Sequence, residues 1–340
     1  MFRDAMSRSG VRRGRGAIGV ALSALMLATL GACGALGGED SSKASGGGDG
    51  GLEKPKIKVA LLPVVDLAPL RLAQEGGYFK AEGLEVEAVD APSGQASMTK
   101  MIGGEVDIAF STYMPFFVAK SKGAADIRLV ADSVSASPKS NAVVTVPASP
   151  VKTINDLAGK KIAITDKNTA SHLLTVSVMK DHGVDTSKVQ WVPMALPNIS
   201  AALLSGQVDA GYLPEPFLTQ ASKVAGATPV VDIATGATQD FPLAGFGSLG
   251  SFVDKNPKTL AAFQRAMAKA VRDSADRSKI EPLIVKYAKV DAETASLLTL
   301  PTFGSTLDPR RLQRVPDLLL QTGVLTAKLD AAPMLAPQAG

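Results

Sequence analysis

The sequence predicts an α/β protein with two lobes of similar build, on three observations. Segments with strand-like alternation are separated by segments with helical spacing, which favours mostly parallel sheets with right-handed crossovers. A helix–turn–strand–turn unit occurs twice, at Thr99–Phe116 and Ser200–Phe217, where Gly104-Glu105-Val106-Asp107 matches Gly206-Gln207-Val208-Asp209. A chain of 340 residues with 46% apolar content is long enough for two cores. We expect each lobe to direct strand ends and helix starts toward a shared cleft.

The first lobe is expected to contain five strands and two helices. The strands are expected at 56–62, 84–89, 106–110, 127–131 and 141–146. One helix is expected to begin at Asp66 or Ala68, with Pro69 in its first turn, and to reach Gln74. Ser93 is the expected N-cap of the other, and glycine pairs at 76–77 and 103–104 end both helices.

The second lobe is expected to begin after the proline-flanked segment 147–150. Thr153 and Asp156 have the spacing of a capping box, and Thr169 is the expected N-cap of a helix that reaches Lys180. Strands are expected at 161–165, 189–192, 208–213 and 228–231, with a helix starting near Glu215.

The last third of the chain is expected to cross back at 236–253 and then to be helical. Asn256 and Pro257 predict a helix start, and Leu260, Phe263 and Met267 recur at helical spacing, so they are expected to face a core. Further helices are expected near 281–288, 292–298 and 309–321, and the last ten residues are expected to fray.

The N-terminal segment has the layout of an export signal. Five arginines and one aspartate accompany an apolar run, Ala17–Leu30, which is shorter than the about 20 residues that span a bilayer. The run ends in Leu30-Gly31-Ala32-Cys33, which resembles a bacterial lipobox, so we expect lipid on Cys33. A buried Cys33 after an ordinary signal is the alternative. The Gly-, Ser- and acid-rich residues that follow predict a flexible tether.

Charge and composition exclude several classes of protein. The net charge of +4 matches that of the first 32 residues, so the remainder is near neutral and gives no argument for nucleic-acid binding. Cys33 is the only cysteine, and His172 and His182 are the only histidines. A zinc cluster based on histidine or a Cys/His nucleophile pair is therefore excluded, and no metal or cofactor is expected.

Helix N-termini that follow strands are the expected ligand-binding positions. Their free amides and partial positive charge attract anions, and ligands of open α/β sheets bind outside the carboxyl ends of strands. Hydroxyl groups beside these amides suit a sulfonate, nitrate or carboxylate group. The candidate residues at such positions are Asp66, Gln95, Ser111, Thr112, Tyr113, Thr169, Ala170, Ser171 and Glu215.

Each candidate also has a purely structural explanation. Ser and Thr are common helix caps. Glu215 would accept hydrogen bonds from an amine or an amidine-like ring, or would only stabilise the first turn of a helix. Tyr113 either stacks on a ligand or belongs to a core. His172 either faces the cleft or is solvated, and Asp107 and Asp209 are expected to brace the turns into their strands.

Gly245–Gly250 matches the dinucleotide-binding pattern G-x-G-x-x-G, which requires a strand before it and a helix after it. Pro242 interrupts the segment that should form the strand before this pattern, and Ser251–Val253 is expected to be extended. We therefore expect these glycines to let a crossing strand bend.

Three blocks resemble the substrate-binding proteins of ABC importers of the nitrate/sulfonate/taurine type, which are similar to thiamine-pyrimidine binding proteins. The blocks are Leu72–Glu87, Ile154–Ala163 and Gly206–Phe217, within a resemblance that runs from about Lys56 to Leu325. The resemblance implies a bilobed, periplasmic-binding-protein-like (type II) fold. Two mixed, mostly parallel sheets with flanking helices would be joined by a hinge near Asn141–Val146 and Pro242–Gly250.

The resemblance also implies a domain order and a function. Residues 1–32 would form the signal peptide, 33–55 the tether, 56–142 plus 246–328 lobe I, 143–245 lobe II and 329–340 a C-terminal tail. A monomeric lipoprotein on the extracytoplasmic face of the cell membrane would deliver a small anionic or zwitterionic solute to an ABC permease and its ATPase, without catalysis. A binding protein for a thiamine-precursor pyrimidine, an enzyme and a sensor on the same fold are the alternatives.

Overall fold

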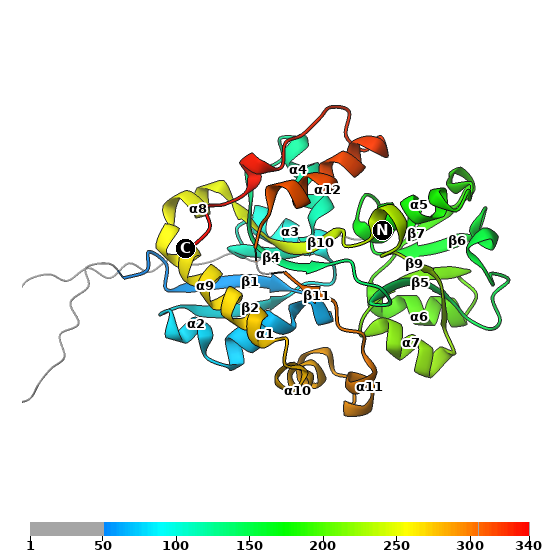
Figure 1. Cartoon of the computed structure of the whole chain (residues 1–340), viewed down its shortest axis with the longest axis horizontal. Helices are drawn as coiled ribbons and strands as arrows, with labels where there is room; N and C mark the ends of the chain where they lie inside the picture. Colours follow the sequence, from blue (N-terminus) through cyan, green and yellow to red (C-terminus); the bar gives the residue numbers. More distant parts are fainter. Residues whose placement is uncertain (1–50, 305, 340) are drawn as a thin grey trace, which may run out of the picture. The chain divides into compact units, whose positions relative to one another are not determined.

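The computed structural model describes residues 51–304 and 306–339, whose strands form two sheets (Figure 1). The strand order is β11-β4-β10-β3-β1-β2 in the first sheet and β7-β6-β8-β5-β9 in the second. The predicted export signal, Cys33 and most of the predicted tether lie outside the described residues. The strands are β1 (Lys56–Leu61), β2 (Glu85–Asp90), β3 (Ile108–Thr112), β4 (Ile127–Ser135), β5 (Asn141–Thr145), β6 (Lys161–Ile164), β7 (Gln190–Pro193), β8 (Ala210–Pro214), β9 (Thr228–Asp232), β10 (Pro242–Leu249) and β11 (Thr302–Phe303).

Helices surround both sheets. They are α1 (Ala68–Glu75), α2 (Tyr78–Ala81), α3 (Gly94–Ile102), α4 (Tyr113–Ser121), α5 (Ala170–Asp181), α6 (Leu196–Leu204), α7 (Phe217–Ala225), α8 (Gly250–Lys255), α9 (Pro257–Asp273), α10 (Arg277–Ala288), α11 (Ala292–Leu297) and α12 (Pro309–Gln321). Short 3-10 helices occur at Val65–Leu67, Ile154–Leu157, Thr186–Lys188, Gly236–Thr238 and Ala332–Met334. Among the described residues, no helix is long and apolar enough to cross a membrane.

Both sheets are mixed, as predicted. β1 pairs in parallel with β2 and β3, and β6 pairs in parallel with β7 and β8. The remaining pairs, those of β10 with β3 and β4, of β11 with β4, and of β5 with β8 and β9, are antiparallel. Among the described strands, five pairs are antiparallel and four are parallel, so the expectation of mostly parallel sheets is wrong. The reason is that β5 and β10 enter their sheets from the opposite direction after a crossing.

The chain passes between the sheets at 136–140 and at 233–241, immediately before β5 and β10. The amide of Ala136 donates a hydrogen bond to the carbonyl of Phe241 over 2.8 Å, so the two crossings run side by side. The expected hinge segments, Asn141–Val146 and Pro242–Gly250, follow the two crossings along the chain and do not form them. They form β5 and β10, which are hydrogen-bonded on both edges.

The repeated unit recognised in the sequence performs the same task in both halves. The carboxylate of Asp107 accepts a hydrogen bond from the amide of Lys58 over 2.9 Å, at the start of β1. The carboxylate of Asp209 accepts the equivalent bond from the amide of Lys161 over 2.8 Å, at the start of β6. Both carboxylates therefore bind the neighbouring parallel strand, and not the turns into β3 and β8 that we expected them to brace.

Several helix starts were predictable and others were not. Ser93 accepts a hydrogen bond from the Ala96 amide, and Thr153 and Asp156 form the predicted capping box, although the helix that follows is a 3-10 turn. Thr169 stands at the N-cap of α5, but its hydroxyl bonds elsewhere. Asp66 does not cap α1, because it lies inside the preceding 3-10 helix.

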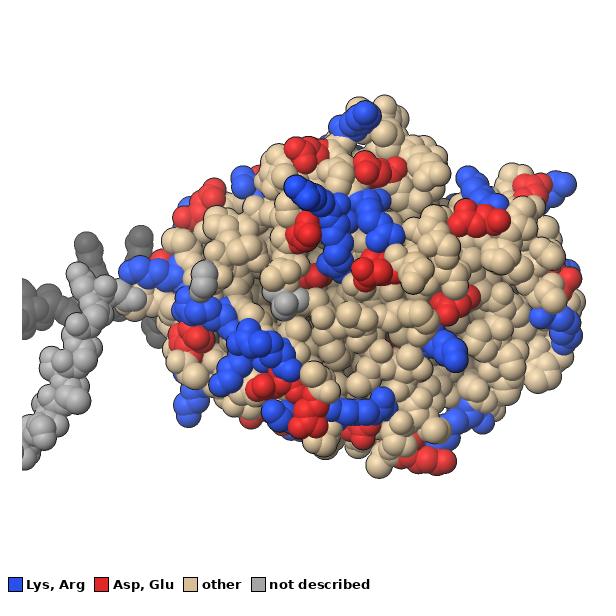
Figure 2. Space-filling model, viewed as in Figure 1, with Lys and Arg blue, Asp and Glu red and all other residues tan. Residues whose placement is uncertain are grey.

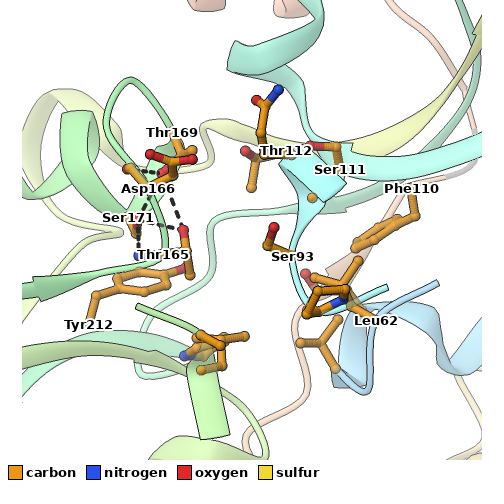
Figure 3. Close-up of a pocket in the computed structure, with 18 of the residues that line it drawn as sticks. Leu62, Ser93, Phe110, Ser111, Thr112, Thr165, Asp166, Thr169, Ser171 and Tyr212 are labelled. Carbon is orange, nitrogen blue, oxygen red and sulfur yellow. Dashed lines mark hydrogen bonds between the residues drawn. The ribbon is translucent and has the colours of Figure 1, made fainter. Parts of the chain in front are cut away.

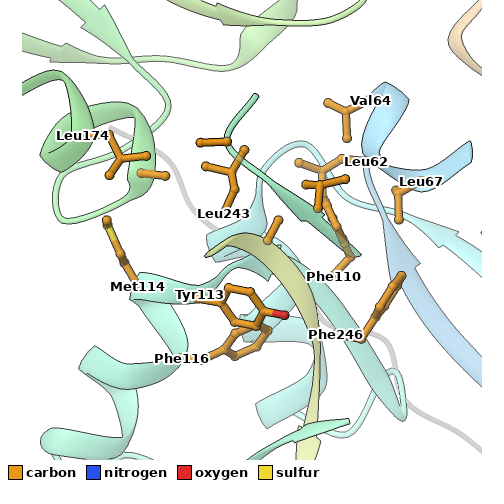
Figure 4. Close-up of a cluster of buried hydrophobic side chains, with 14 of the residues drawn as sticks. Leu62, Val64, Leu67, Phe110, Tyr113, Met114, Phe116, Leu174, Leu243 and Phe246 are labelled. Carbon is orange, nitrogen blue, oxygen red and sulfur yellow. The ribbon is translucent and has the colours of Figure 1, made fainter. Parts of the chain in front are cut away.

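The pattern at Gly245–Gly250 is explained by packing. The expectation of an extended chain after Gly250 is wrong, since α8 begins there. β10 is nevertheless antiparallel to its neighbours, and a Cβ on Gly250 would lie within 2.5 Å of the Asp126 carboxylate. An acid at this helix start would repel a phosphate. Cβ atoms on Gly245 and Gly247 would collide with the rings of Tyr113 and Phe116, so these glycines let α4 approach β10 (Figure 4).

Adding a methyl group at Gly247 should therefore destabilise the fold. The new Cβ would lie 2.5 Å from the ring of Phe116, which is fully buried and has no room to retreat. We expect Gly247→Ala to lower the free energy of unfolding by about 1–3 kcal/mol, as overpacking does in other cores. Urea denaturation measures this change. Gly51→Ala, where nothing lies within 4 Å of the new Cβ, is the matched control, and equal stability of both variants would contradict the explanation.

The C-terminal part returns to the first sheet. α9 packs against α1, α2 and β4, and α12 packs against α4 and β10. The expected fraying of the last ten residues is wrong for the part that is described. Met334 and Ala336 are buried, and the amide of Ala336 donates a hydrogen bond to Leu129 in β4 over 2.9 Å.

Candidate functional site

A small cavity lies between the two sheets, where strands of both end. Leu62 follows β1, Ser111 and Thr112 end β3, Thr165 follows β6, and Pro214 ends β8, and all of them line the cavity. The cavity has a volume of about 60 Å³. This is the position outside the carboxyl ends of strands at which open α/β sheets bind ligands.

Four helix N-termini border this cavity. Ser93 is the N-cap of α3, Thr112 of α4, Thr169 of α5 and Ala195 of α6, and each of them belongs to the lining. α3 and α4 come from the half with the first sheet, and α5 and α6 come from the other. The free amides at such ends and the helix dipoles favour a negatively charged group or a hydrogen-bond acceptor.

Hydroxyl groups of the second half form a compact cluster in the cavity wall (Figure 3). The Ser171 Oγ lies 2.8 Å from the Oγ1 atoms of both Thr165 and Thr169, and it accepts a hydrogen bond from the Thr165 amide over 3.0 Å. Thr169 donates its own hydrogen to the carbonyl of Asp166 over 2.8 Å. The cluster is therefore held in place by its own bonds and by the turn between β6 and α5.

The facing wall carries an unsatisfied hydroxyl. Ser111 is buried, and its Oγ has no hydrogen-bond partner in the described part of the chain. A Cβ on Gly94 would lie 2.4 Å from this oxygen, so only glycine lets the start of α3 approach the end of β3 so closely. A buried hydroxyl without a partner costs free energy, which a bound ligand would recover.

The cavity contains a buried acid. Asp66 is only 9% exposed, and burial raises the pKa of its carboxyl to about 7. Beside it in the lining, the Tyr212 hydroxyl donates a hydrogen bond to the Asn141 Oδ1 over 2.6 Å, and burial raises the pKa of Tyr212. Among the described residues, no lysine, arginine or histidine lines this cavity.

Six of the nine candidate residues line the cavity, and they come from both halves of the structure. They are Asp66, Gln95, Ser111, Thr112, Thr169 and Ser171. Residues that the sequence did not single out join them, among them Thr165, Asn141 and Tyr212. Thr165 directly follows a predicted strand, which was a usable signal, whereas nothing in the sequence marked Asn141 or Tyr212.

Three candidates lie outside the lining. Tyr113 is fully buried in the core under β10, and its hydroxyl donates a hydrogen bond to the Asp132 Oδ1 over 2.6 Å (Figure 4). Ala170 stands between two lining residues but is itself buried. The carboxylate of Glu215 accepts hydrogen bonds from the Thr219 hydroxyl and, across the two halves, from the Thr299 amide over 3.2 Å.

His172 is neither in the cavity lining nor simply solvated. Its ring lies edge-on to Trp191, with centroids 4.7 Å apart, and its Nδ1 accepts a hydrogen bond from the Asn168 amide. Burial lowers the pKa of His172 to about 4. No group of three or more His, Cys, Asp or Glu side chains that could hold a metal ion occurs in residues 51–304 and 306–339.

A family model described as NMT1/THI5 like matches residues 65–278, which include both sheets' central strands and most of the cavity lining. The chain belongs to the NMT1/THI5-like family. This NMT1/THI5-like protein is 25% identical over 228 residues to a protein of Escherichia coli (strain K12) that is named for binding aliphatic sulfonates. That match covers 66% of this chain and 67% of the relative.

A second relative is named as an enzyme. It is a 4-amino-5-hydroxymethyl-2-methylpyrimidine phosphate synthase of Aspergillus parasiticus, 28% identical over 145 residues, which cover 42% of this chain and 41% of the relative. Among solved structures, the ligand-binding component of an ABC-type import system from Staphylococcus aureus has a TM-score of 0.74 at 16% identity and covers 84% of this chain and 97% of its own. The fold is therefore periplasmic-binding-protein-like.

Proposed function

We propose that this NMT1/THI5-like protein is an extracytoplasmic solute-binding protein that captures a small anionic or zwitterionic solute and delivers it to an ABC permease. The observation that carries the proposal is the cavity itself. Helix N-termini from both halves and a hydroxyl cluster from the second half surround it, and a buried hydroxyl in its wall has no partner among the described residues. The E. coli relative named for binding aliphatic sulfonates supports the same class of solute.

The two halves are proposed to act as lobes that close on the solute. The expected bounds, 56–142 with 246–328 for lobe I and 143–245 for lobe II, would divide β5 and β10. We therefore propose 56–135 with 242–328 as lobe I and 141–232 as lobe II, with the paired crossings at 136–140 and 233–241 as the hinge. In this structure the halves also meet directly. The amide of Val65 donates a hydrogen bond to the carbonyl of Glu215 over 3.2 Å, and Lys223 pairs with Glu293 over 3.0 Å. A ligand that contacts both halves would bind an arrangement with the lobes together more tightly than one with the lobes apart. It would therefore shift the equilibrium toward the closed arrangement.

The N-terminal segment is proposed to anchor the protein to the outer face of the cell membrane. Lipid on Cys33 and a flexible tether after it would hold a monomeric binding body close to the permease. The tether does not reach residue 55 as expected, because the Glu53 carboxylate accepts hydrogen bonds from the Lys258 and Thr259 amides at the start of α9. On the body, basic and acidic side chains are interspersed over the face in Figure 2. Labelling with radioactive palmitate in a bacterial host would test the anchor, with Cys33→Ser as the unlabelled control.

Two alternative functions, binding of a pyrimidine and catalysis on it, have less support. The pyrimidine phosphate synthase among the relatives favours a thiamine-precursor pyrimidine as ligand, or catalysis on it. Against catalysis, neither His172 nor His182 lines the cavity, and Cys33 precedes the described residues by a long segment. Binding without turnover, measured by recovery of the unchanged solute, would separate a binding protein from an enzyme.

Removing the central hydroxyl of the cluster should weaken binding. Ser171 contacts both Thr165 and Thr169, so Ser171→Ala breaks the cluster that faces the solute. We expect isothermal titration with sulfonates, carboxylates and aminopyrimidines to show about tenfold weaker affinity, the equivalent of one or two hydrogen bonds. Ser121→Ala, which removes an exposed hydroxyl on α4, should leave the affinity unchanged. Failure of every solute to bind the wild type would contradict the proposed function.

A further inference from the structure

The carboxylate of Asp66 is an acceptor in the wall of the cavity, and among the described residues only its own backbone amide donates to it. The residue is 9% exposed and follows β1, inside the 3-10 helix Val65–Leu67. In the part of the chain that the structure describes, no other residue donates a hydrogen bond to this carboxylate, and no lysine, arginine or histidine pairs with it. Burying a carboxylate without a partner is costly, so a proton or a ligand has to compensate it.

The donors closest to Asp66 direct their hydrogens elsewhere. Tyr212 donates to Asn141 over 2.6 Å, and Tyr287 donates to the carbonyl of Val64 over 3.2 Å. Ser133 donates to the backbone carbonyl of Asp66, over 2.9 Å, and not to its carboxylate. The surrounding hydroxyl groups therefore leave this acceptor free.

The other polar groups of the cavity favour a negatively charged ligand group, whereas the Asp66 carboxylate favours a positively charged one. The N-termini of α3, α4 and α5 present amide donors, which favour an anionic or acceptor group. The second acid in the lining, Asp166, already accepts a hydrogen bond from the Lys167 amide over 2.7 Å. The cavity thus offers donors at helix ends from both halves, and at Asp66 a carboxylate that no other described residue satisfies.

We propose, resting on the proposed function, that Asp66 makes the cavity specific for solutes that carry a protonated amine together with an anionic group. The amine pairs with the Asp66 carboxylate, and the anionic group occupies the helix N-termini. A plain anion such as nitrate or an alkanesulfonate would leave the buried carboxylate without a partner. A zwitterion satisfies the Asp66 carboxylate and the helix N-termini at the same time. Charge-assisted hydrogen bonds of this kind are stronger than those between neutral groups.

The raised pKa of Asp66 agrees with this assignment. Burial without a cation brings the pKa of its carboxyl to about 7, so the free protein holds a proton there over part of the physiological range. An ammonium group at hydrogen-bond distance would favour the ionised carboxylate and replace that proton.

The test uses matched pairs of solutes that differ in the amine alone. Taurine is compared with 1-propanesulfonate, and 3-aminopropanoate with butanoate, by isothermal titration at pH 8 on the wild type, Asp66→Asn and Asp90→Asn. Asp90 is an exposed acid at the end of β2, outside the cavity lining, so Asp90→Asn controls for the general loss of a negative charge. Thermal unfolding of each variant confirms that it is folded.

We expect the wild type and Asp90→Asn to bind the amine-bearing member of at least one pair tenfold or more tightly than its partner, and Asp66→Asn to lose that preference. Equal or tighter binding of the amine-free members by the wild type would overturn the role of Asp66 and leave the proposed function intact. A preference for the amine that survives in Asp66→Asn would also overturn it. No binding of either member of either pair would contradict both the amine assignment and the proposed class of solute.

Discussion

Replacing Arg311 with methionine should lower the free energy of unfolding by about 3–5 kcal/mol, because it leaves a buried carboxylate without its charged partner. Arg311 in α12 donates from Nη1 to the Asp132 Oδ2 over 2.7 Å, and the side chain of Asp132 is only 2% exposed. The pair ties α12 to β4, which lies beside the edge strand β11 of the first sheet. Methionine keeps most of the apolar stem, so the loss of charge dominates.

The surroundings of Asp132 show why the acid cannot simply be solvated after this change. Its Oδ1 accepts hydrogen bonds from Tyr113 over 2.6 Å and from the Ser133 amide over 3.0 Å. A Cβ on Gly304 would lie within 2.5 Å of the same carboxylate, so the chain closes tightly over it. Without Arg311, the carboxylate would therefore remain almost fully buried with no charged partner.

A matched ion pair on the surface provides the control for Arg311. Arg265 and Glu82 are also 2.7 Å apart, but their side chains are 46% and 28% exposed. Arg265→Met should cost less than about 1 kcal/mol, as exposed pairs do. Urea denaturation of both variants measures the difference, and comparable losses would show that burial of Asp132 does not set the strength of the pair.

Much of the fold could be predicted because its signals are local. The repeated Gly-x-Val-Asp unit, the glycine pairs that end helices and the cap at Ser93 each act within a few residues. The prediction that helix starts after strands meet at one cleft needs only the direction of parallel strands. It brought together Ser111 and Ser171, which lie 60 residues apart, from opposite halves.

What could not be predicted depends on contacts between distant segments. Tyr113 stands at a helix start, as a ligand-binding residue would, but glycines in β10 let its ring enter the core. Glu215 follows a strand in the same way, yet Thr299, 84 residues further along, supplies its hydrogen-bond donor. The burial of Asp66 results from packing between both halves, which no local pattern encodes.

Asp66→Asn should stabilise the free protein at pH 8 and have little effect near pH 4. The pKa of this carboxyl is raised from 3.8 to about 7 in the folded protein, so the folded state holds a proton that the unfolded state releases between these values. The contribution of Asp66 to the free energy of unfolding of the wild type should therefore fall as the pH rises through that window. The full penalty above it is at most about 4 kcal/mol, at about 1.4 kcal/mol for each pKa unit.

The neighbours of Asp66 do not obscure this window. Burial raises the pKa of both Tyr212 and Tyr287, so neither titrates between pH 4 and 8. Denaturant titrations of the wild type, Asp66→Asn and Asp90→Asn at pH 4, 6 and 8 measure the effect. The difference between the wild type and Asp66→Asn should grow with pH, while Asp90→Asn should follow the wild type. Parallel profiles of all three would show that Asp66 is solvated in the free protein, as it would be if the halves separate without a ligand. In that case its burial, and the cost of its charge, would arise only when the cavity closes.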